Sequence, residues 1–212
     1  MQYCERIIRE SVERFETQYT KDYDNYSRPL HEMNKIELES ITEQDTTKVV
    51  RPFLYKWGMG RVLGQISACD WERNLTRSIQ SNAKLMESFR ASYLENVDLH
   101  SVESGVIDCY ESFKSAVGKI AAAKTLHLIC PNFFALWDNP IANGFHQSNG
   151  INVEQFSGKD YYAFLQFVQT LMTSYGMLLS ELAVQYKKGK LKIVDEFLWW
   201  SAWRPFSIFL PK

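Results

Sequence analysis

The segment KTLHLICPNFFALWDNP, residues 124–140, decides the expected fold, because it contains the end of one helix, a loop and the start of another. Apolar side chains from Ile120 to Cys130 lie on every side of a helical wheel, which is typical of a helix at the centre of a protein. Pro131 ends this helix, since proline has no backbone N–H to continue the hydrogen-bond ladder. Pro140 is favoured in the first turn of the next helix. The segment therefore predicts two helices joined by a loop, with charged side chains in an apolar setting.

The helical period extends over most of the chain. Apolar residues recur at spacings of three and four around residues 7–19, 36–57, 71–89, 102–113 and 161–175, which predicts amphipathic helices. Two shorter helices follow, the last with the aromatic sequence FLWWSAW. Pro52 lies inside the second stretch and predicts a kink or a break there. No stretch alternates with the period of a β-strand, so we expect an all-α fold in which residues 1–212 form one compact multi-helix domain.

Polar or glycine-containing stretches predict the connections between these helices. KDYDNYSRPLHEMN predicts a polar arm or loop near residues 20–35, and HQSNGINVEQFSGKD predicts a polar connection near 146–157. GMGRVLG, residues 58–64, is expected to form a flexible junction. Ser157 and Asp160 have the spacing of a capping box, which predicts the start of a helix after the polar connection.

The composition limits the classes of partner and cofactor. With 24 basic and 25 acidic residues the net charge is −1, so binding to nucleic acid would require a local basic patch. No apolar run has the ~20 residues that span a bilayer, and the charged start of the chain lacks the pattern of a signal peptide. The four cysteines form no CxxC pair, and neither a metal-type histidine motif nor a Walker A loop occurs. We therefore expect a cytoplasmic protein with no membrane contact, no metal site and no cofactor.

Three polar residues in the apolar segment are the main site candidates. Lys124 and His127 are three residues apart and share one face of the predicted buried helix. Asp138 comes just before the next helix, where its carboxylate can accept hydrogen bonds from free N–H groups. In a structural interpretation, Lys124 and Asp138 form an ion pair and His127 is a core histidine bonded to a carbonyl. In a catalytic interpretation, burial lowers the pKa of Lys124 so that it acts as an amine nucleophile or base, and Asp138 moves protons.

The stretch SAVGKIAAAKTLHLICPNFFALWDNPIA, residues 115–142, resembles the helix–hairpin–helix DNA glycosylases. In that family a hairpin of the form L-P-G-[VI]-G-x-K precedes a helix, a loop and an aspartate that opens another helix. Ala116 stands in place of the first hairpin glycine, and the spacing between Gly118 and Lys119 is one residue shorter than in the family. The four-cysteine iron–sulfur signature of some members is absent.

The resemblance implies roles for two lysines and one aspartate. Lys119 lies 19 residues before Asp138, close to the family spacing, and Lys124 lies 14 residues before it. By this resemblance, one of the two lysines attacks the sugar carbon and Asp138 assists loss of the base. His127 and Trp137 would then form walls of the pocket.

Three further segments have a structural and a functional interpretation. RPFLYKWGMGRVLG, residues 51–64, could contact a phosphate through Arg61 and stack on a base through Trp57, but a helix C-terminus with basic residues is the favoured interpretation. KKGKLK, residues 187–192, could contact phosphates, but a solvated basic turn is the favoured interpretation. FLWWSAW could be a stacking surface or an oligomer interface, but sealing of the core is the favoured interpretation.

Two functions follow from these observations. In the first, the protein acts on nucleic acid through a local basic patch and resembles base-excision glycosylases. Lys124 or Lys119 is then the amine, Asp138 its acid–base partner, and His127, Trp137, Arg61 and Trp57 bind the substrate. In the second, the protein is a non-catalytic helical binding or interaction protein in which Lys124 and Asp138 form a structural ion pair.

Overall fold

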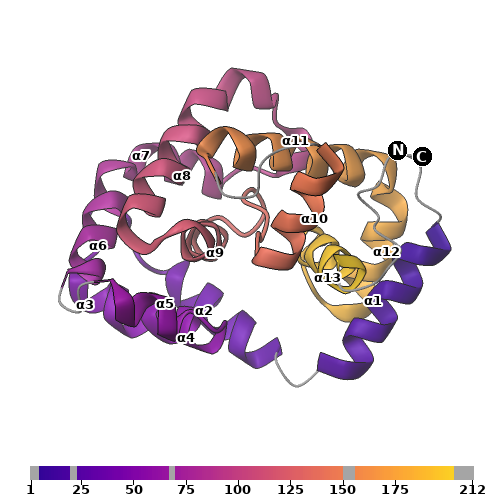
Figure 1. The fold of residues 1–212 in the computed structure, drawn as a ribbon, viewed down its shortest axis with the longest axis horizontal. Coiled ribbons are helices and arrows are strands. Elements are labelled where there is room, and N and C mark those ends of the chain that lie inside the picture. Colours follow the sequence, from indigo (N-terminus) through magenta and orange to yellow (C-terminus); the bar gives the residue numbers. More distant parts are fainter. Residues whose placement is uncertain (1–4, 20–22, 67–69, 150–155, 203–212) are drawn as a thin grey trace.

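The computed structural model describes residues 5–19, 23–66, 70–149 and 156–202. Within these ranges every regular element is helical and there is no β-strand, which confirms the all-α prediction (Figure 1). The first half contains α1 (Glu5–Tyr19), α2 (Tyr23–Met33), α3 (Glu43–Asp45), η2 (Thr46–Val50), α4 (Arg51–Lys56), α5 (Gly60–Gln65), α6 (Trp71–Ser81) and α7 (Ala83–Arg90). The second half contains η3 (Leu94–Asn96), η4 (Leu99–Val102), α8 (Glu103–Val117), α9 (Lys119–Ile129), α10 (Asn139–Asn149), α11 (Gly158–Ser174), α12 (Gly176–Tyr186) and α13 (Lys190–Ala202).

The predicted central helix is α9. Its residues from Ile120 to Ile129 are all buried, and α8 packs against it more extensively than any other element does. The chain passes from α8 to α9 through Gly118 alone, whose φ of 80° is a conformation that side chains with a Cβ rarely adopt. The Gly118 N–H donates to the Lys114 carbonyl, and the Gly118 carbonyl accepts from Ala122. Gly118 therefore ends one helix and begins the next, which makes a tight helical hairpin.

The predicted end of α9 and start of α10 are also confirmed. Cys130 follows α9 directly and begins the non-helical segment that contains Pro131 and leads to Asp138. α10 begins at Asn139, with Pro140 in its first turn. The expected capping box of Ser157 and Asp160 is formed at the start of α11, because the Ser157 hydroxyl accepts from the Asp160 N–H and the Asp160 carboxylate accepts from the Ser157 N–H.

The polar arm expected near residues 20–35 is wrong for the part that the structure describes. Residues 23–33 form α2, with Pro29 inside it. Tyr26 and Met33 lie seven residues apart, on one side of a helix, and both are buried. Burial of these two residues outweighs the polar composition of the segment. Residues 20–22 of the predicted arm lie outside the described residues.

The polar connection expected near 146–157 is shorter than predicted. Residues 146–149 continue α10, and α11 begins at Gly158. The remainder of the predicted connection, at 150–155, lies outside the described residues. The glycine-containing stretch at 58–64 is a turn at Gly58 followed by the short helix α5, so it is not a junction along its whole length.

The interruption predicted at Pro52 is present. The chain forms a π-helical turn, η2, immediately before α4, and the Arg51 N–H donates to the Thr46 carbonyl five residues earlier. Pro52 then occupies the first turn of α4, where no N–H is needed. The π-helical turn and α4 are followed by Trp57, which caps the C-terminal end of α4 and faces the interior of the molecule.

The elements from the two ends of the chain, α1 and α13, pack against each other. α13 packs against α1, α10, α11 and α12. Figure 1 shows α1, α12 and α13 grouped on one side of α9 and α10, while α2, α4 and α5 lie on another side. The residues of α1, α2, α4, α9 and α13 that face one another surround the site described next.

Candidate functional site

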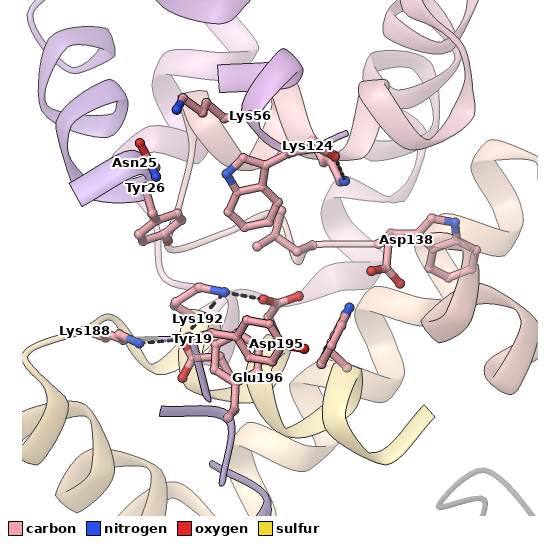
Figure 2. A pocket seen from close by; sticks show the side chains of 15 residues that line it. Tyr19, Asn25, Tyr26, Lys56, Lys124, Asp138, Lys188, Lys192, Asp195 and Glu196 are labelled. Atoms are coloured by element: carbon pink, nitrogen blue, oxygen red, sulfur yellow. Dashed lines mark hydrogen bonds and ion pairs between the residues drawn. The ribbon is translucent and has the colours of Figure 1, made fainter. Parts of the chain in front are cut away.

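A cavity of about 380 Å³ lies between these elements (Figure 2). Its volume is in the range of small-molecule binding sites. Much of its wall is aromatic and comes from Phe15, Tyr19, Tyr26, Trp57, Trp137 and Trp199. Its charged lining comes from Lys56, Lys124, Lys188, Lys192, Asp138, Asp195 and Glu196. We call this space the central cavity.

Asp138 is placed in the central cavity by the loop between α9 and α10. His127 donates to the Phe134 carbonyl at 2.7 Å, and the Tyr161 hydroxyl donates to the Ala135 carbonyl at 2.7 Å, so the loop is fixed on two sides. Asp138 Oδ1 accepts a hydrogen bond from the Ile141 N–H at 3.1 Å, as predicted for a residue that caps a helix. Burial raises the pKa of Asp138 to about 6, and the hydrogen bond from Ile141 opposes this shift. Asp138 can therefore exchange a proton near neutral pH.

Lys124 lies in the same cavity but forms a different contact from the one expected. Its Nζ donates to the carbonyl oxygen of Trp57 at 2.9 Å and lies 5.4 Å from the centre of the Trp57 ring. Burial lowers the pKa of Lys124, and the charge of Asp138 partly opposes this effect. In the described part of the chain, no ion pair within 4.0 Å joins Lys124 to Asp138. The predicted structural ion pair is therefore not formed, because the Trp57 carbonyl is the partner of the ammonium group.

His127 is a core residue and not a wall of the cavity. Its side chain is fully buried, and the Phe134 carbonyl can only accept, so Nδ1 carries the proton. Nε2 then accepts a hydrogen bond from the Tyr26 hydroxyl at 2.7 Å. Burial lowers the pKa of His127 to about 4, so the ring is neutral at physiological pH. His127 affects the cavity through Tyr26, whose ring lies in the wall.

The remaining predicted site residues divide into two groups. Trp57 and Trp137 line the central cavity, and Trp137 packs edge-on against Phe164 at 4.6 Å between ring centres. Lys119 does not line it, since its Nζ lies 3.9 Å from the centre of the Phe156 ring. Arg61 is exposed on α5 and does not line it either. The exposed basic residue at the edge of the cavity is Lys56.

The sequence interpretation missed the charged residues that α13 brings to the cavity. Lys192, Asp195 and Trp199 line the same side, at spacings of three and four along a helix that is otherwise mostly apolar. Lys192 Nζ donates to Asp195 Oδ2 at 2.6 Å and lies 5.2–5.4 Å from the ring centres of Phe15, Tyr26 and Trp57. The expectation of a solvated turn at 187–192 is wrong for Lys188 and Lys192, whose side chains are 6% and 7% exposed.

A buried ionic network continues from this pair toward α1. Lys188 forms ion pairs with Glu16 of α1 and, at 2.7 Å, with Glu196 of α13. Glu196 is fully buried, and burial raises its pKa to about 7 against the opposing effect of Lys192 and Lys188. The network contains two lysines and, with Asp195, three acids. The near-neutral pKa of Glu196 fits this balance, because a proton on Glu196 leaves the group without net charge.

Comparisons with protein-family models, with curated proteins and with solved structures find no match to this chain. Over the described ranges, no three His, Cys, Asp or Glu residues are grouped so that they could hold a metal ion. None of the described helices is both long and apolar enough to cross a membrane.

The arrangement combines aromatic surfaces with three acids, of which Asp138 and Asp195 lie in different surroundings. Figure 2 shows Lys124 and Asp138 directed into the central cavity from the side of α9, with Asp195 facing them from α13. Asp195 is in an ion pair with Lys192, whereas Asp138 has no cation within 4.0 Å among the described residues. Pairs of carboxyl groups held in unlike environments are typical of acid–base chemistry.

Proposed function

We propose that this protein acts on nucleic acid by taking one unstacked base into the central cavity and assisting cleavage of its glycosidic bond. The observation that carries the proposal is the position of Asp138. Its carboxyl group has a pKa of about 6, caps α10 and faces an aromatic-lined cavity. A group of this kind can give a proton to a departing base and so assist the loss of that base.

The aromatic lining supports a planar ligand. Six aromatic side chains contribute to a cavity of about 380 Å³. Enzymes that act on a base take it out of the stack and hold it between aromatic or apolar side chains. Base–aromatic stacking contributes about 1–3 kcal/mol per base, which helps to offset the cost of unstacking.

The order of elements supports the same proposal. The resemblance to helix–hairpin–helix glycosylases concerned a hairpin followed by a helix, a loop and an aspartate, and the chain has a tight α8–Gly118–α9 hairpin followed by Asp138 at the start of α10. A role for lysine as nucleophile is less well supported. Lys119 lies against Phe156, and Lys124 donates to Trp57. We therefore propose water, and not an amine, as the attacking group.

Basic residues near the opening could hold the phosphate backbone. Lys56 is exposed at the edge of the cavity, and Arg61 is exposed on the neighbouring α5. No ion pair within 4.0 Å engages either residue in the part of the chain that the structure describes. With few phosphate contacts and a net charge of −1, binding should weaken only modestly as salt rises.

The proposal is tested with oligonucleotides, single-stranded and duplex, that each carry one damaged, mismatched or deaminated base. Base release is detected by alkaline cleavage of the resulting abasic site. We expect release from at least one substrate, at least about 100-fold slower release by D138N, and no adduct on borohydride treatment. Asp70→Asn, at an exposed position before α6, is the control and should leave the rate unchanged.

Two results would overturn parts of this proposal. If no substrate loses its base and no oligonucleotide quenches the tryptophan fluorescence, the protein does not act on nucleic acid. Tight binding without base release would instead indicate the non-catalytic alternative. A borohydride adduct that disappears in Lys124→Met would replace water by the Lys124 amine as the attacking group.

A further inference from the structure

We propose that Asp195 is a second catalytic group of the central cavity, which takes a proton from the water that attacks the sugar carbon. This inference rests on the proposed function and extends it. Asp138 would act on the departing base, and Asp195 on the incoming water. The two residues are 57 positions apart in the chain and come from different helix regions, so the sequence does not suggest the pair.

The position of Asp195 fits this role. The residue is 8% exposed and lines the central cavity, and its Oδ2 accepts a hydrogen bond from Lys192 Nζ at 2.6 Å. Over the described ranges, Oδ1 of Asp195 accepts no hydrogen bond. Figure 2 shows its carboxylate between Lys192 and the open space that Asp138 also faces. One oxygen is therefore held by the ammonium group, and the other is available to a water molecule in the cavity.

Lys192 keeps Asp195 in place. The ammonium group lies 5.2–5.4 Å from the ring centres of Phe15, Tyr26 and Trp57 and 3.6 Å from Glu196. Asp195 and Glu196 raise the pKa of Lys192 against the effect of burial, so this lysine remains charged. A permanent cation in an aromatic cage fixes the direction of the carboxylate that it holds.

The surroundings of Asp138 and Asp195 differ, as expected if one carboxyl group donates a proton and the other accepts one. Asp138 receives one backbone hydrogen bond, and the negative charge of Asp195 contributes to its raised pKa after the larger effect of burial. Asp195 has an ammonium partner, whereas Asp138 has none within 4.0 Å among the described residues. One group is suited to hold a proton and the other to accept one. Paired carboxyl groups divide these roles in enzymes that hydrolyse O-glycosidic bonds.

The reaction balances with water as the only co-reactant. The bond between the sugar carbon and the base nitrogen breaks, and its electron pair goes to the base, which takes the proton of Asp138. A water oxygen forms the new bond to the sugar carbon and gives a proton to Asp195. Transfer of that proton to solvent, and uptake of one by Asp138, restores the starting state. The net change is hydrolysis to a free base and an abasic sugar.

The experiment uses the full chain and the substrate that gives the fastest base release in the screen described above. Single-turnover rates are measured for the wild type, D195N, D138N and the double variant D195N/K192M. We expect D195N to slow base release by at least about 100-fold, with substrate binding changed less than threefold. Formate or azide can replace a lost carboxylate or attack the sugar carbon directly. Either anion should therefore raise the rate of base release by D195N at least tenfold. If Asp195 had only a structural role, these anions would not change the rate of base release by D195N.

The double variant keeps the test valid if D195N fails to fold. It removes both charges of the pair, so no unpaired ammonium is left buried. Release by D195N or by the double variant within threefold of the wild-type rate, while D138N is inactive, would overturn the role of Asp195 and leave the proposed function standing. Slow release by both variants without rescue by formate or azide would also overturn it. Failure of the wild type to release any base would overturn both proposals. Asp98→Asn, at an exposed cap of η4, is the control.

Discussion

Lys124 Nζ donates to the carbonyl oxygen of Trp57 at 2.9 Å, and this hydrogen bond joins the central helix α9 to the C-terminal end of α4. The carbonyl groups at a helix end lack partners within the helix and carry partial negative charge, which suits an ammonium group. Trp57 lies in the wall of the central cavity. A charged residue that looked misplaced in an apolar helix therefore holds one side of the site in position.

The first prediction concerns this contact. Lys124→Met keeps most of the side-chain volume but leaves the Trp57 carbonyl without its donor, so we expect the free energy of unfolding to fall by about 1–2 kcal/mol. Urea denaturation measures this change, and tryptophan emission reports whether the surroundings of Trp57 become more polar. Lys56→Met, at the exposed edge of the same cavity, should leave both unchanged. Greater stability of K124M with an unchanged emission spectrum would contradict the prediction.

The second prediction concerns the pH dependence that Asp138 confers. Its pKa is about 6 in the folded protein and 3.8 in the reference state, so between these values the folded state binds more protons than the unfolded state. The free energy of unfolding therefore falls as pH rises from about 4 to above 6, by up to about 3 kcal/mol from this group. D138N is neutral throughout and still able to cap α10, so its stability relative to the wild type should increase between pH 4.5 and 7.5.

Urea denaturation of both proteins at the two pH values measures the difference. Asp45→Asn is a control of opposite sign, because the hydrogen bonds of Asp45 with Thr42 lower its pKa. That variant should be less stable than the wild type at pH 7.5. If the difference in free energy of unfolding between D138N and the wild type were the same at pH 4.5 and 7.5, burial would not destabilise the ionised carboxylate of Asp138.

The sequence was informative where a local rule determines the structure. The all-round apolar pattern of 120–130 predicted α9, and the proline on each side of the loop predicted the start of α10 and the capping position of Asp138. α2 was missed because, over residues 25–33, its helix buries only Tyr26 and Met33 within a polar sequence that contains Pro29. Its stability comes from tertiary contacts, which composition does not show.

For a similar reason, the sequence predicted only part of the candidate site: Lys124 and Asp138 were identified, and the charged residues of α13 were not. Lys192 and Asp195 are three residues apart in a helix with few other polar residues, the same signal that identified Lys124 and His127. The neighbouring lysines, however, suggested a solvated turn. The partners of Lys192 in its aromatic cage come from α1, α2 and the end of α4. That arrangement depends on how distant helices pack, and no local pattern encodes it.

The third prediction concerns the hairpin between α8 and α9. Gly118 has a φ of 80°, and a Cβ built there would lie 4.0 Å from Val62, so the space is open and the backbone conformation is the constraint. Gly118→Ala should reduce the free energy of unfolding by about 1–2 kcal/mol. Gly64→Ala, in α5 with open space and no such φ, should be neutral or slightly stabilising. Equal effects of the two substitutions in thermal denaturation would argue against strain at Gly118.

The fourth prediction concerns the buried hydrogen bond between Tyr26 and His127. Because His127 Nε2 accepts from the Tyr26 hydroxyl, Tyr26→Phe leaves a buried acceptor without its donor. We expect a loss of about 1–3 kcal/mol in the free energy of unfolding, measured with urea at pH 7.5. Tyr93→Phe, at a residue that is 55% exposed, should change it by less than about 0.5 kcal/mol. Similar small effects for both would mean that the bond contributes little to stability.

The last prediction separates the members of the buried ionic network between α1 and α13. Lys188 is shared by Glu16 and Glu196, so Lys188→Met leaves two buried carboxylates without this cation and should cost about 3–5 kcal/mol. Glu196→Gln instead leaves two lysines with Glu16 and Asp195, a balanced set. The pKa of Glu196 is about 7 when folded and 4.5 in the reference state, so its carboxylate lowers stability as pH rises from about 4.5 to above 7.

E196Q should therefore be at least as stable as the wild type at pH 8, and its advantage should shrink toward pH 5. Urea denaturation at both pH values measures this, with Lys35→Met, in an exposed ion pair with Glu32, as a control expected to change stability by less than about 0.5 kcal/mol. A large loss of stability in E196Q at pH 8, equal to that in K188M, would mean that Glu196 is a required anion of the network. The packing of α1 against α13 would then depend on the negative charge of Glu196.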